Sequence, residues 1–262
     1  MQAVTGVFLS QTRAEQAVRK LQSSGLQADR ITLLTPGGKS QKKLESIPVD
    51  NAEQPGMGST VGAVVGGAAG LSGGLVAAVV PGVGAVTAIG LLGAALLTAA
   101  GATLGRAAGG LLENFMTEGL PEDEIFVYED ALRKDRSVVV ALAEDEAAAG
   151  PIRELLKSEG AEAIDAAREQ WWIGLRSAEQ EHYVKSGRTL HDDEKFYRLG
   201  FEAALHARSR CKEFDQASAE MASGLEELER QYPGVDLAVP FTRGYERGRE
   251  YYQLLCDKSK AA

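Results

Sequence analysis

Between positions 54 and 105 the chain contains no Asp, Glu, Lys, Arg or His, although charged residues make up 25% of the whole sequence. An uncharged run of this length is typical of a segment that avoids water, either in a lipid bilayer or inside a protein assembly. The missing charge therefore indicates where this part of the chain belongs, and it indicates little about an activity.

Residues that commonly bind metals or act as nucleophiles are also scarce. The only cysteines are Cys211 and Cys256, which are too few for a disulfide framework and are not spaced as metal ligands. The three histidines have no metal-ligand spacing, and a helix start explains the acidic residues after His191 better than a cation site does. We therefore predict no catalytic residue, no cofactor and no metal.

Motifs for catalysis and for nucleic-acid binding are missing or weak. Residues 70–74 match the pattern G-x-S-x-G, but that motif needs a preceding strand, and a glycine-rich run matches it by chance. The net charge is −9, without a basic stripe, which argues against a nucleic-acid partner held by phosphate contacts. The sequence therefore predicts a protein that is not an enzyme and does not bind nucleic acid.

Glycine is abundant where charge is absent, and much of it recurs at four-residue spacing. Small residues at positions i and i+4 let two helix backbones approach closely in a membrane, so we predict that these glycines form helix-packing faces. The predicted packing residues are Gly58, Gly62, Gly66, Gly70 and Gly74 in the first half of the run, and Gly93, Gly101, Gly105 and Gly109 in and just after the second.

Pro81 and Gly82 divide the uncharged run near its middle, and this pair is typical of a turn. The two halves, residues 57–80 and 83–105, are each long enough to cross a bilayer core of about 30 Å as a helix. The prediction is a hydrophobic helical hairpin over residues 54–112. We expect it to contact the lipid bilayer and to pack against further copies in a homo-oligomer.

An alternative places the same hairpin in the core of a soluble oligomer. The run is rich in Ala and Gly rather than Leu and Phe, so its free energy of membrane insertion is marginal. No aromatic residue lies between Met57 and Leu112, so the interfacial aromatic belt of membrane helices is missing from the hairpin. The sequence leaves both interpretations open.

The uncharged run interrupts an α/β pattern. Apolar periodicity predicts a β-α-β unit within residues 1–35, and further helices and strands within residues 120–165. Two similar half-units that close one sheet are typical of a ferredoxin-like fold, so we predict a split α/β domain of that kind. The expected strands are 4–9, 31–34, 138–142 and 163–164.

Residues 166–262 are predicted to form an all-α region, which makes the chain an α+β protein. Trp171 and Trp172 suit a membrane or partner surface, or packing inside the protein. The pattern aromatic-x-x-Gly-aromatic-Glu occurs at residues 197–202 and again at 241–246. This repeat indicates either a docking element or two helices that cross at a glycine.

Residues 1–165 resemble bacterial general stress proteins of the heat-induced and low-temperature-induced type. The resemblance rests on the β-α-β start with Val7-Phe8, the uncharged Gly/Ala hairpin, and the stretch Gly-Leu-Pro-Glu-Asp-Glu at 119–124 followed by Tyr128-Glu129. It implies a cytoplasmic, stress-associated protein and leaves a membrane location open. It supplies no catalytic residues to carry over, and it does not cover residues 166–262.

The N-terminus has no charged segment followed by a long apolar stretch, so we expect no signal peptide and place the soluble parts in the cytoplasm. Together these features predict a non-enzymatic stress-response protein, associated with the cytoplasmic side of the inner membrane through its glycine-packed hairpin. The alternative is a cytoplasmic scaffold whose hairpins form the core of an oligomer.

Overall fold

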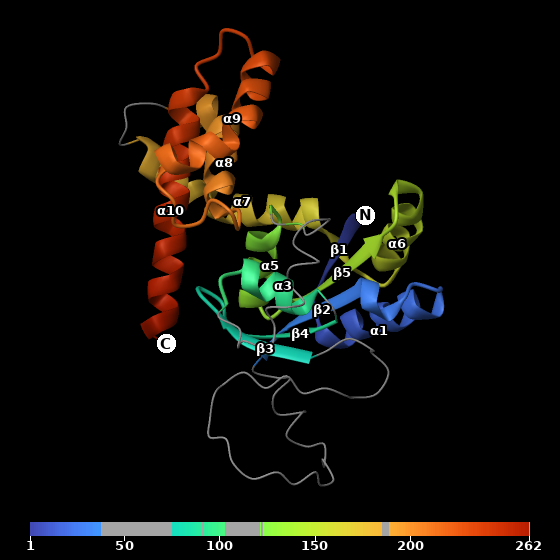
Figure 1. Ribbon diagram of the computed structural model, residues 1–262. Coiled ribbons are helices and arrows are strands. Elements are labelled where there is room, and N and C mark those ends of the chain that lie inside the picture. Colours follow the sequence, from blue (N-terminus) through green and yellow to red (C-terminus); the bar gives the residue numbers. More distant parts are fainter. Residues whose placement is uncertain (38–74, 91, 103–120, 122, 185–188, 262) are drawn as a thin grey trace. The chain divides into compact units, whose positions relative to one another are not determined.

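The computed structural model describes residues 1–37, 75–90, 92–102, 121, 123–184 and 189–261 (Figure 1). The chain divides into two compact units. The sheet unit comprises Met1–Pro121 and Val127–Ala167, and the helical unit comprises Glu122–Phe126 and Arg168–Ala262. The described part of the uncharged stretch therefore lies in the sheet unit and not in a separate hairpin domain.

The sheet unit is built on six strands, each antiparallel to its neighbours, in the order β3-β4-β2-β5-β1-β6. Strand β5 lies between β1 and β2, and β1 lies between β5 and β6, so each half of the α/β pattern contributes a strand to the other. The four expected strands are confirmed. The bounds are β1 (Gln2–Phe8), β2 (Ile31–Pro36), β3 (Leu75–Val80), β4 (Gly84–Ile89), β5 (Ser137–Ala143) and β6 (Glu162–Ala163).

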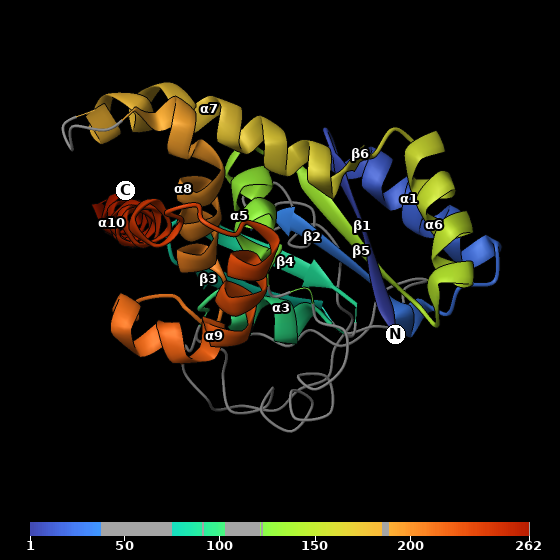
Figure 2. The same cartoon turned by 90° about the horizontal axis from the view of Figure 1, so that it is seen from above.

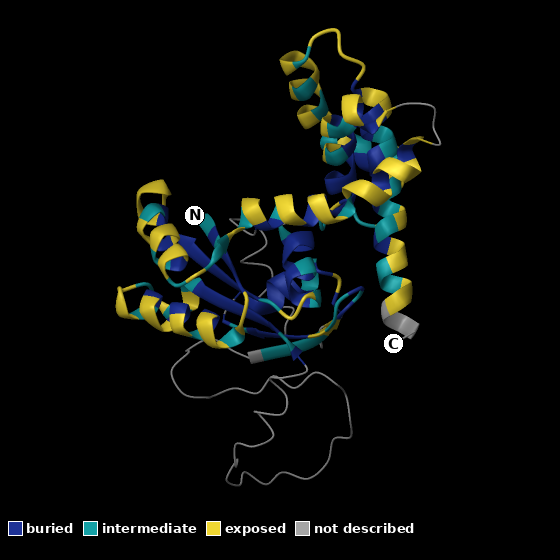
Figure 3. Cartoon of the chain, turned by 180° about the vertical axis from the view of Figure 1, so that it is seen from behind, coloured by how far each residue is buried: buried dark blue, intermediate teal, exposed yellow. Residues whose placement is uncertain are grey.

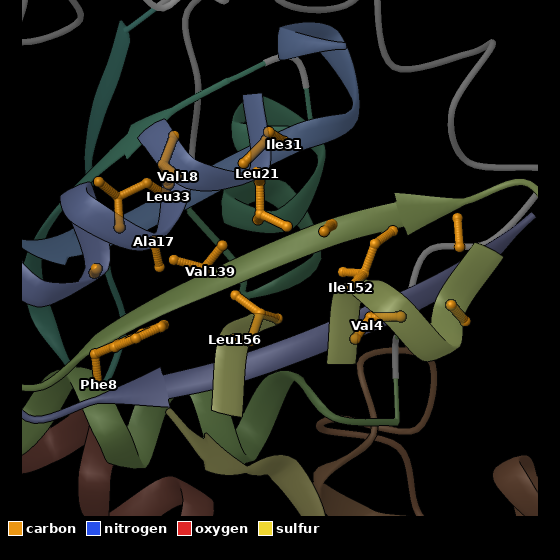
Figure 4. Packing of buried hydrophobic residues seen from close by; sticks show 14 residues of the cluster. Val4, Phe8, Ala17, Val18, Leu21, Ile31, Leu33, Val139, Ile152 and Leu156 are labelled. Carbon is orange, nitrogen blue, oxygen red and sulfur yellow. The ribbon is translucent and has the colours of Figure 1, made fainter. Parts of the chain in front are cut away.

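Helices α1 (Gln11–Ser23) and α6 (Glu146–Ser158) cover one face of this sheet (Figure 2). Each begins after a residue whose side chain accepts a hydrogen bond from a first-turn amide, Ser10 from Arg13 and Asp145 from Ala148. The short helix η1 (Ala28–Arg30) leads into β2. Figure 4 shows the buried cluster between helices and sheet, which consists of Val4, Phe8, Ala14, Ala17, Val18, Leu21, Ile31, Leu33, Val139, Ala141, Ala143, Ala149, Ile152 and Leu156.

Helices α3 (Gly93–Ala99) and α5 (Ile125–Arg133) pack toward the opposite face. The hydroxyl of Tyr128 in α5 lies 2.8 Å from Thr5 Oγ1 in β1. The amide of Leu92, just before α3, donates to Thr32 Oγ1 in β2 at 3.2 Å. Because both faces are covered, every residue of β5 is buried, and the centre of the sheet is dark blue in Figure 3.

The helical hairpin predicted for residues 54–112 is wrong over residues 75–89, which form strands β3 and β4 of a β-hairpin. Pro81 and Gly82 occupy the turn between them, which is closed by a hydrogen bond of 3.1 Å from the Val83 amide to the Val80 carbonyl. Gly82 has φ +75, and a proline followed by a glycine of positive φ is typical of a type II turn.

The composition of residues 75–89 explains why they form strands and not a helix. Their β-branched side chains favour strands over helices, and strand pairing with β2 outweighs the helical reading of the glycine spacing. The β-branched residues are Val76, Val79, Val80, Val83, Val86, Thr87 and Ile89. Residues 83–105 do not form one long helix, since α3 has only seven residues. Within the described ranges, no helix combines the length and the apolar character needed to cross a membrane.

The helical unit contains most of α7 (Ile164–Val184), with α8 (Leu190–Leu205), α9 (Phe214–Gln231) and α10 (Ala238–Ala261). Helices α8 and α10 carry the two copies of the aromatic-glycine repeat and cross there. A Cβ atom added at Gly200 would lie 1.9 Å from the carbonyl oxygen of Phe241. The repeat therefore forms a helix crossing, which is one of the two interpretations given by the sequence.

Candidate functional site: the uncharged edge of the sheet

The outermost strand of the sheet comes from the uncharged stretch. Strand β3 has the sequence Leu-Val-Ala-Ala-Val-Val, and in the described part of the chain it pairs with β4 alone. The register runs from Leu75 opposite Ile89 to Val80 opposite Gly84. An edge strand presents a row of N–H and C=O groups that can pair with another strand. Within the described ranges, the outer edge of β3 therefore has no strand paired with its backbone groups, and its side chains are apolar.

The side chains of β3 differ in exposure, and its adjacent residues Val79 and Val80 project to opposite faces of the sheet. Val80 is buried, whereas Val79 is 60% exposed, and Val76, Ala77 and Ala78 are half-buried. Figure 3 shows β3 mostly in the colour of intermediate burial, in contrast to the central strands. An exposed valine beside half-buried neighbours makes this edge an apolar surface of the sheet unit.

Tight packing holds the hairpin in place behind this edge. A Cβ atom added at Gly93 of α3 would lie 2.7 Å from Ala88 Cβ, so helix and strand are in close contact. A Cβ atom added at Gly90, which has φ +123, would lie 2.2 Å from the carbonyl oxygen of Ile31. Arg133 Nη1 also donates to the Gly82 carbonyl at 3.4 Å. These contacts fix the hairpin, and with it the position of β3.

The opposite edge of the sheet has a different character. Strand β6 has only two residues, Glu162 and Ala163, and it pairs with Gly6 and Val7 of β1. The carboxylate of Glu162 forms an ion pair with Arg136. A short edge with a charged side chain is protected against pairing with further strands. Of the two edges, β3 is the one suited to association.

Of the glycines that the sequence predicted as helix-packing residues, Gly93 and Gly101 lie among the residues that the structure describes. Gly93 does pack closely, but its neighbour is Ala88 of strand β4 and not a second helix. Gly101 lies in the turn after α3, with φ +85, and is exposed. Pro81 and Gly82 occupy a turn, as described above. Outside the described residues lie Gly58, Gly62, Gly66, Gly70, Gly74, Gly105 and Gly109.

A buried ion pair is the strongest polar cluster of the helical unit. The carboxylate of Glu179 is 1% exposed and accepts two hydrogen bonds of 3.0 Å from the guanidinium group of Arg247. It also accepts a hydrogen bond of 2.8 Å from the hydroxyl of Tyr197. Burial, together with the negative charge of Glu179, raises the pKa of Tyr197 well above its usual range. The Glu179 carboxylate, the Arg247 guanidinium group and the Tyr197 hydroxyl are hydrogen-bonded within the cluster. The cluster therefore links α7, α8 and α10, and its three groups are not directed at a binding site.

A second polar cluster surrounds Glu194 of α8. Its carboxylate accepts hydrogen bonds of 2.7 Å from Arg176 and one of 2.9 Å from Trp172 Nε1. The hydrogen bonds from Arg176 lower the pKa of Glu194. Arg198 lies in the same shallow pocket and bridges Glu169 and Glu202 at 2.5 and 2.7 Å. Each charge already has a partner, as in a structural network.

The other residues of the helical unit that the sequence singled out also have structural roles. Asp192 and Asp193 lie in the first turn of α8, as the helix-start interpretation predicts, and the Asp193 carboxylate accepts a 2.6 Å hydrogen bond from Tyr183. Trp171 and Trp172 are both buried, and Trp171 packs 4.8 Å from Phe126 between ring centroids. Among the described residues, no cluster of three or more His, Cys, Asp or Glu side chains could hold a metal ion.

The position of β3 at the edge of the sheet was not predicted from the sequence. Its signal was the density of valine between residues 76 and 86, which the regular glycine spacing obscured. No protein-family model matches the chain, and comparisons with curated proteins and with solved structures also found no match. The resemblance to general stress proteins therefore stays a prediction.

Proposed function

We propose that this chain is a non-enzymatic protein that works by association, with its uncharged stretch as the core of an assembly of several copies. One observation carries the proposal. Residues 75–80, at the end of the first half of that stretch, form the edge strand of the sheet, where Val79 is 60% exposed and the strand carries no charge. A chain with net charge −9 that keeps such a strand at its surface has a site for a protein partner.

The backbone of β3 favours a protein partner over lipid at this position. Lipid-exposed open sheet edges do not occur within the hydrocarbon region, because each unpaired backbone group there costs several kcal/mol. A second strand satisfies these groups, whereas an acyl chain does not. For residues 75–89, the unpaired backbone groups of β3 therefore favour the oligomeric scaffold over a pair of membrane-crossing helices.

A second candidate function is attachment to the inner membrane in a bacterial stress response. Residues 54–74 precede β3 and carry no ionisable side chain, so the sequence itself still supports contact with a bilayer through this segment. The stress association rests on the resemblance of residues 1–165 to general stress proteins. In this reading the α+β and helical units lie on the cytoplasmic side.

We further infer a ferredoxin-like arrangement for the part of the sheet without β3 and β4. The support is the order β2-β5-β1-β6, in which two β-α-β halves interleave and α1 and α6 share one face. Under this proposal β3 and β4 extend the sheet at β2, and the uncharged stretch enlarges the domain from one side.

Sedimentation equilibrium of the full chain, with and without vesicles of phosphatidylethanolamine and phosphatidylglycerol, separates the two functions. The scaffold predicts a mass that is a multiple of 27.8 kDa in the absence of lipid, and no binding to vesicles. The membrane function predicts co-flotation with vesicles and, in cells, release by detergent but not by high salt. A chain that stays monomeric and does not bind vesicles contradicts both functions.

A further inference from the structure

We propose that β3 pairs with β3 of a second copy of this chain, so that two sheets join into one continuous antiparallel sheet across a two-fold axis. This proposal rests on the scaffold function and names the surface and the partner that it uses. The same strand is then half of the interface on each copy, as in other two-fold symmetric dimers.

The sequence of β3 is compatible with itself in this arrangement. A two-fold axis perpendicular to the sheet places one residue opposite its own copy. If that residue is Ala77, Leu75 lies opposite Val79 and Val76 lies opposite Ala78 of the second copy. If it is Ala78, Val76 lies opposite Val80. In both registers every opposing pair is apolar, the smallest side chains lie at the axis, and no like charges meet.

The residues of β3 itself include none of those by which proteins usually block an edge. It contains no lysine or other charged residue, no proline and no bulge in its pairing with β4. Its position is fixed in advance by Gly90 and Gly93, so pairing requires little ordering of this hairpin. The other edge of the sheet has a two-residue strand with a paired glutamate. Of the two edges, β3 is therefore the one at which a second copy pairs.

The test is the double substitution Ala77→Lys with Val79→Lys in the full chain. The two lysines project from the same side of the strand and meet their counterparts near the axis, so we expect the dimer Kd to rise by at least about tenfold. The matched control is Val235→Lys with Val239→Lys. These two exposed valines of the helical unit receive the same added charge. Sedimentation equilibrium measures the Kd, and far-ultraviolet circular dichroism checks the fold.

Each outcome decides between the parts of the account. A dimeric wild type that only the β3 double variant dissociates supports the pairing. An oligomeric wild type that responds equally to both double variants overturns the β3 interface and leaves the scaffold function standing. A monomeric wild type overturns both. If the double variant does not fold, Val79→Lys alone decides, since this side chain is 60% exposed and tolerates a charge in the isolated chain.

Discussion

Gly200 of α8 and Gly244 of α10 lie against each other's helix in a reciprocal contact. A Cβ atom at Gly200 would lie 1.9 Å from the carbonyl oxygen of Phe241, and one at Gly244 would lie 1.9 Å from that of Tyr197. Phe241 and Tyr197 hold equivalent positions in the two copies of the repeat. The repeated motif therefore lets two backbones approach more closely than any residue with a side chain permits.

This contact predicts that Gly200→Ala and Gly244→Ala both destabilise the helical unit. Overpacking against backbone costs about 1 to 3 kcal/mol, and the conflict at 1.9 Å outweighs the helix propensity gained by alanine. Gly224 of α9 serves as the control, because a Cβ there meets nothing within 4 Å. Gly224→Ala should raise the free energy of unfolding by up to about 1 kcal/mol. Urea unfolding measures all three, and effects of the same sign would contradict the crossing.

The buried ion pair predicts a large loss of stability for Glu179→Ala. This change leaves the guanidinium group of Arg247 with the exposed Glu250 and removes the acceptor of the Tyr197 hydroxyl, which together cost about 3 kcal/mol. In the control pair, Glu227 and Arg230 are both largely exposed, so Glu227→Ala should change stability by less than about 1 kcal/mol. Chemical denaturation compares the two variants. A small effect of Glu179→Ala would mean that the cluster is open to water.

His206 predicts a pH dependence of the helical unit. Burial lowers the pKa of His206 below the ordinary histidine value. The negative charge of Asp123 raises this pKa, whereas the positive charges of Arg168 and Arg210 lower it further. The folded state therefore favours the neutral ring. The contribution of the neutral His206 ring to stability is complete above the ordinary histidine pKa of about 6.5. This contribution is lost as the pH falls through the lowered pKa of His206 in the folded state.

The difference in unfolding free energy between wild type and His206→Gln isolates this effect from the carboxylates. We expect the advantage of the wild type to shrink between about pH 7 and pH 5, the range in which histidine titrates. A difference that stays constant over this range would contradict the burial of the neutral ring.

Two glycines distinguish the β-hairpin from the helical hairpin that the sequence suggested. Gly84 has φ +105 with open space around it, so Gly84→Ala should cost about 1 to 2 kcal/mol through backbone strain alone. Gly90→Ala should cost more, because its Cβ would also meet the Ile31 carbonyl oxygen at 2.2 Å. In a helix both changes would instead stabilise by about 1 kcal/mol. The sign of the change in melting temperature therefore tests the strands.

The two halves of the α/β pattern were predictable because their signals are local. The apolar face of α1 repeats at helical spacing, and residues 138–143 of β5 are a run of apolar residues. The hairpin was not predictable in the same way, because its fold depends on pairing with distant β2, as in the contact between Leu33 and Ile89. Gly93 packs against Ala88 of strand β4, whereas its glycine spacing had predicted a second helix as the neighbour.

In the helical unit, too, one feature was predictable from the sequence and another was not. The repeat at residues 197–202 and 241–246 allowed a glycine crossing to be foreseen, because aromatic and glycine positions recur in one pattern. The pairing of Glu179 with Arg247 had no sequence signal, since both residues look like other charges on amphipathic helices. The fold of the helical unit brings these two side chains together, and the contacts of Glu179 with Arg247 of α10 and Tyr197 of α8 leave its carboxylate buried.

Hydrogen–deuterium exchange of the β3 amides tests the central claim most directly, namely that the uncharged stretch supplies a sheet edge that joins two copies. At concentrations where the wild type is dimeric, pairing protects the outward-facing amides between Leu75 and Val80. The account predicts slow exchange in the wild type and fast exchange at the same amides in the Ala77→Lys, Val79→Lys variant. Fast exchange along β3 in a dimeric wild type would contradict it.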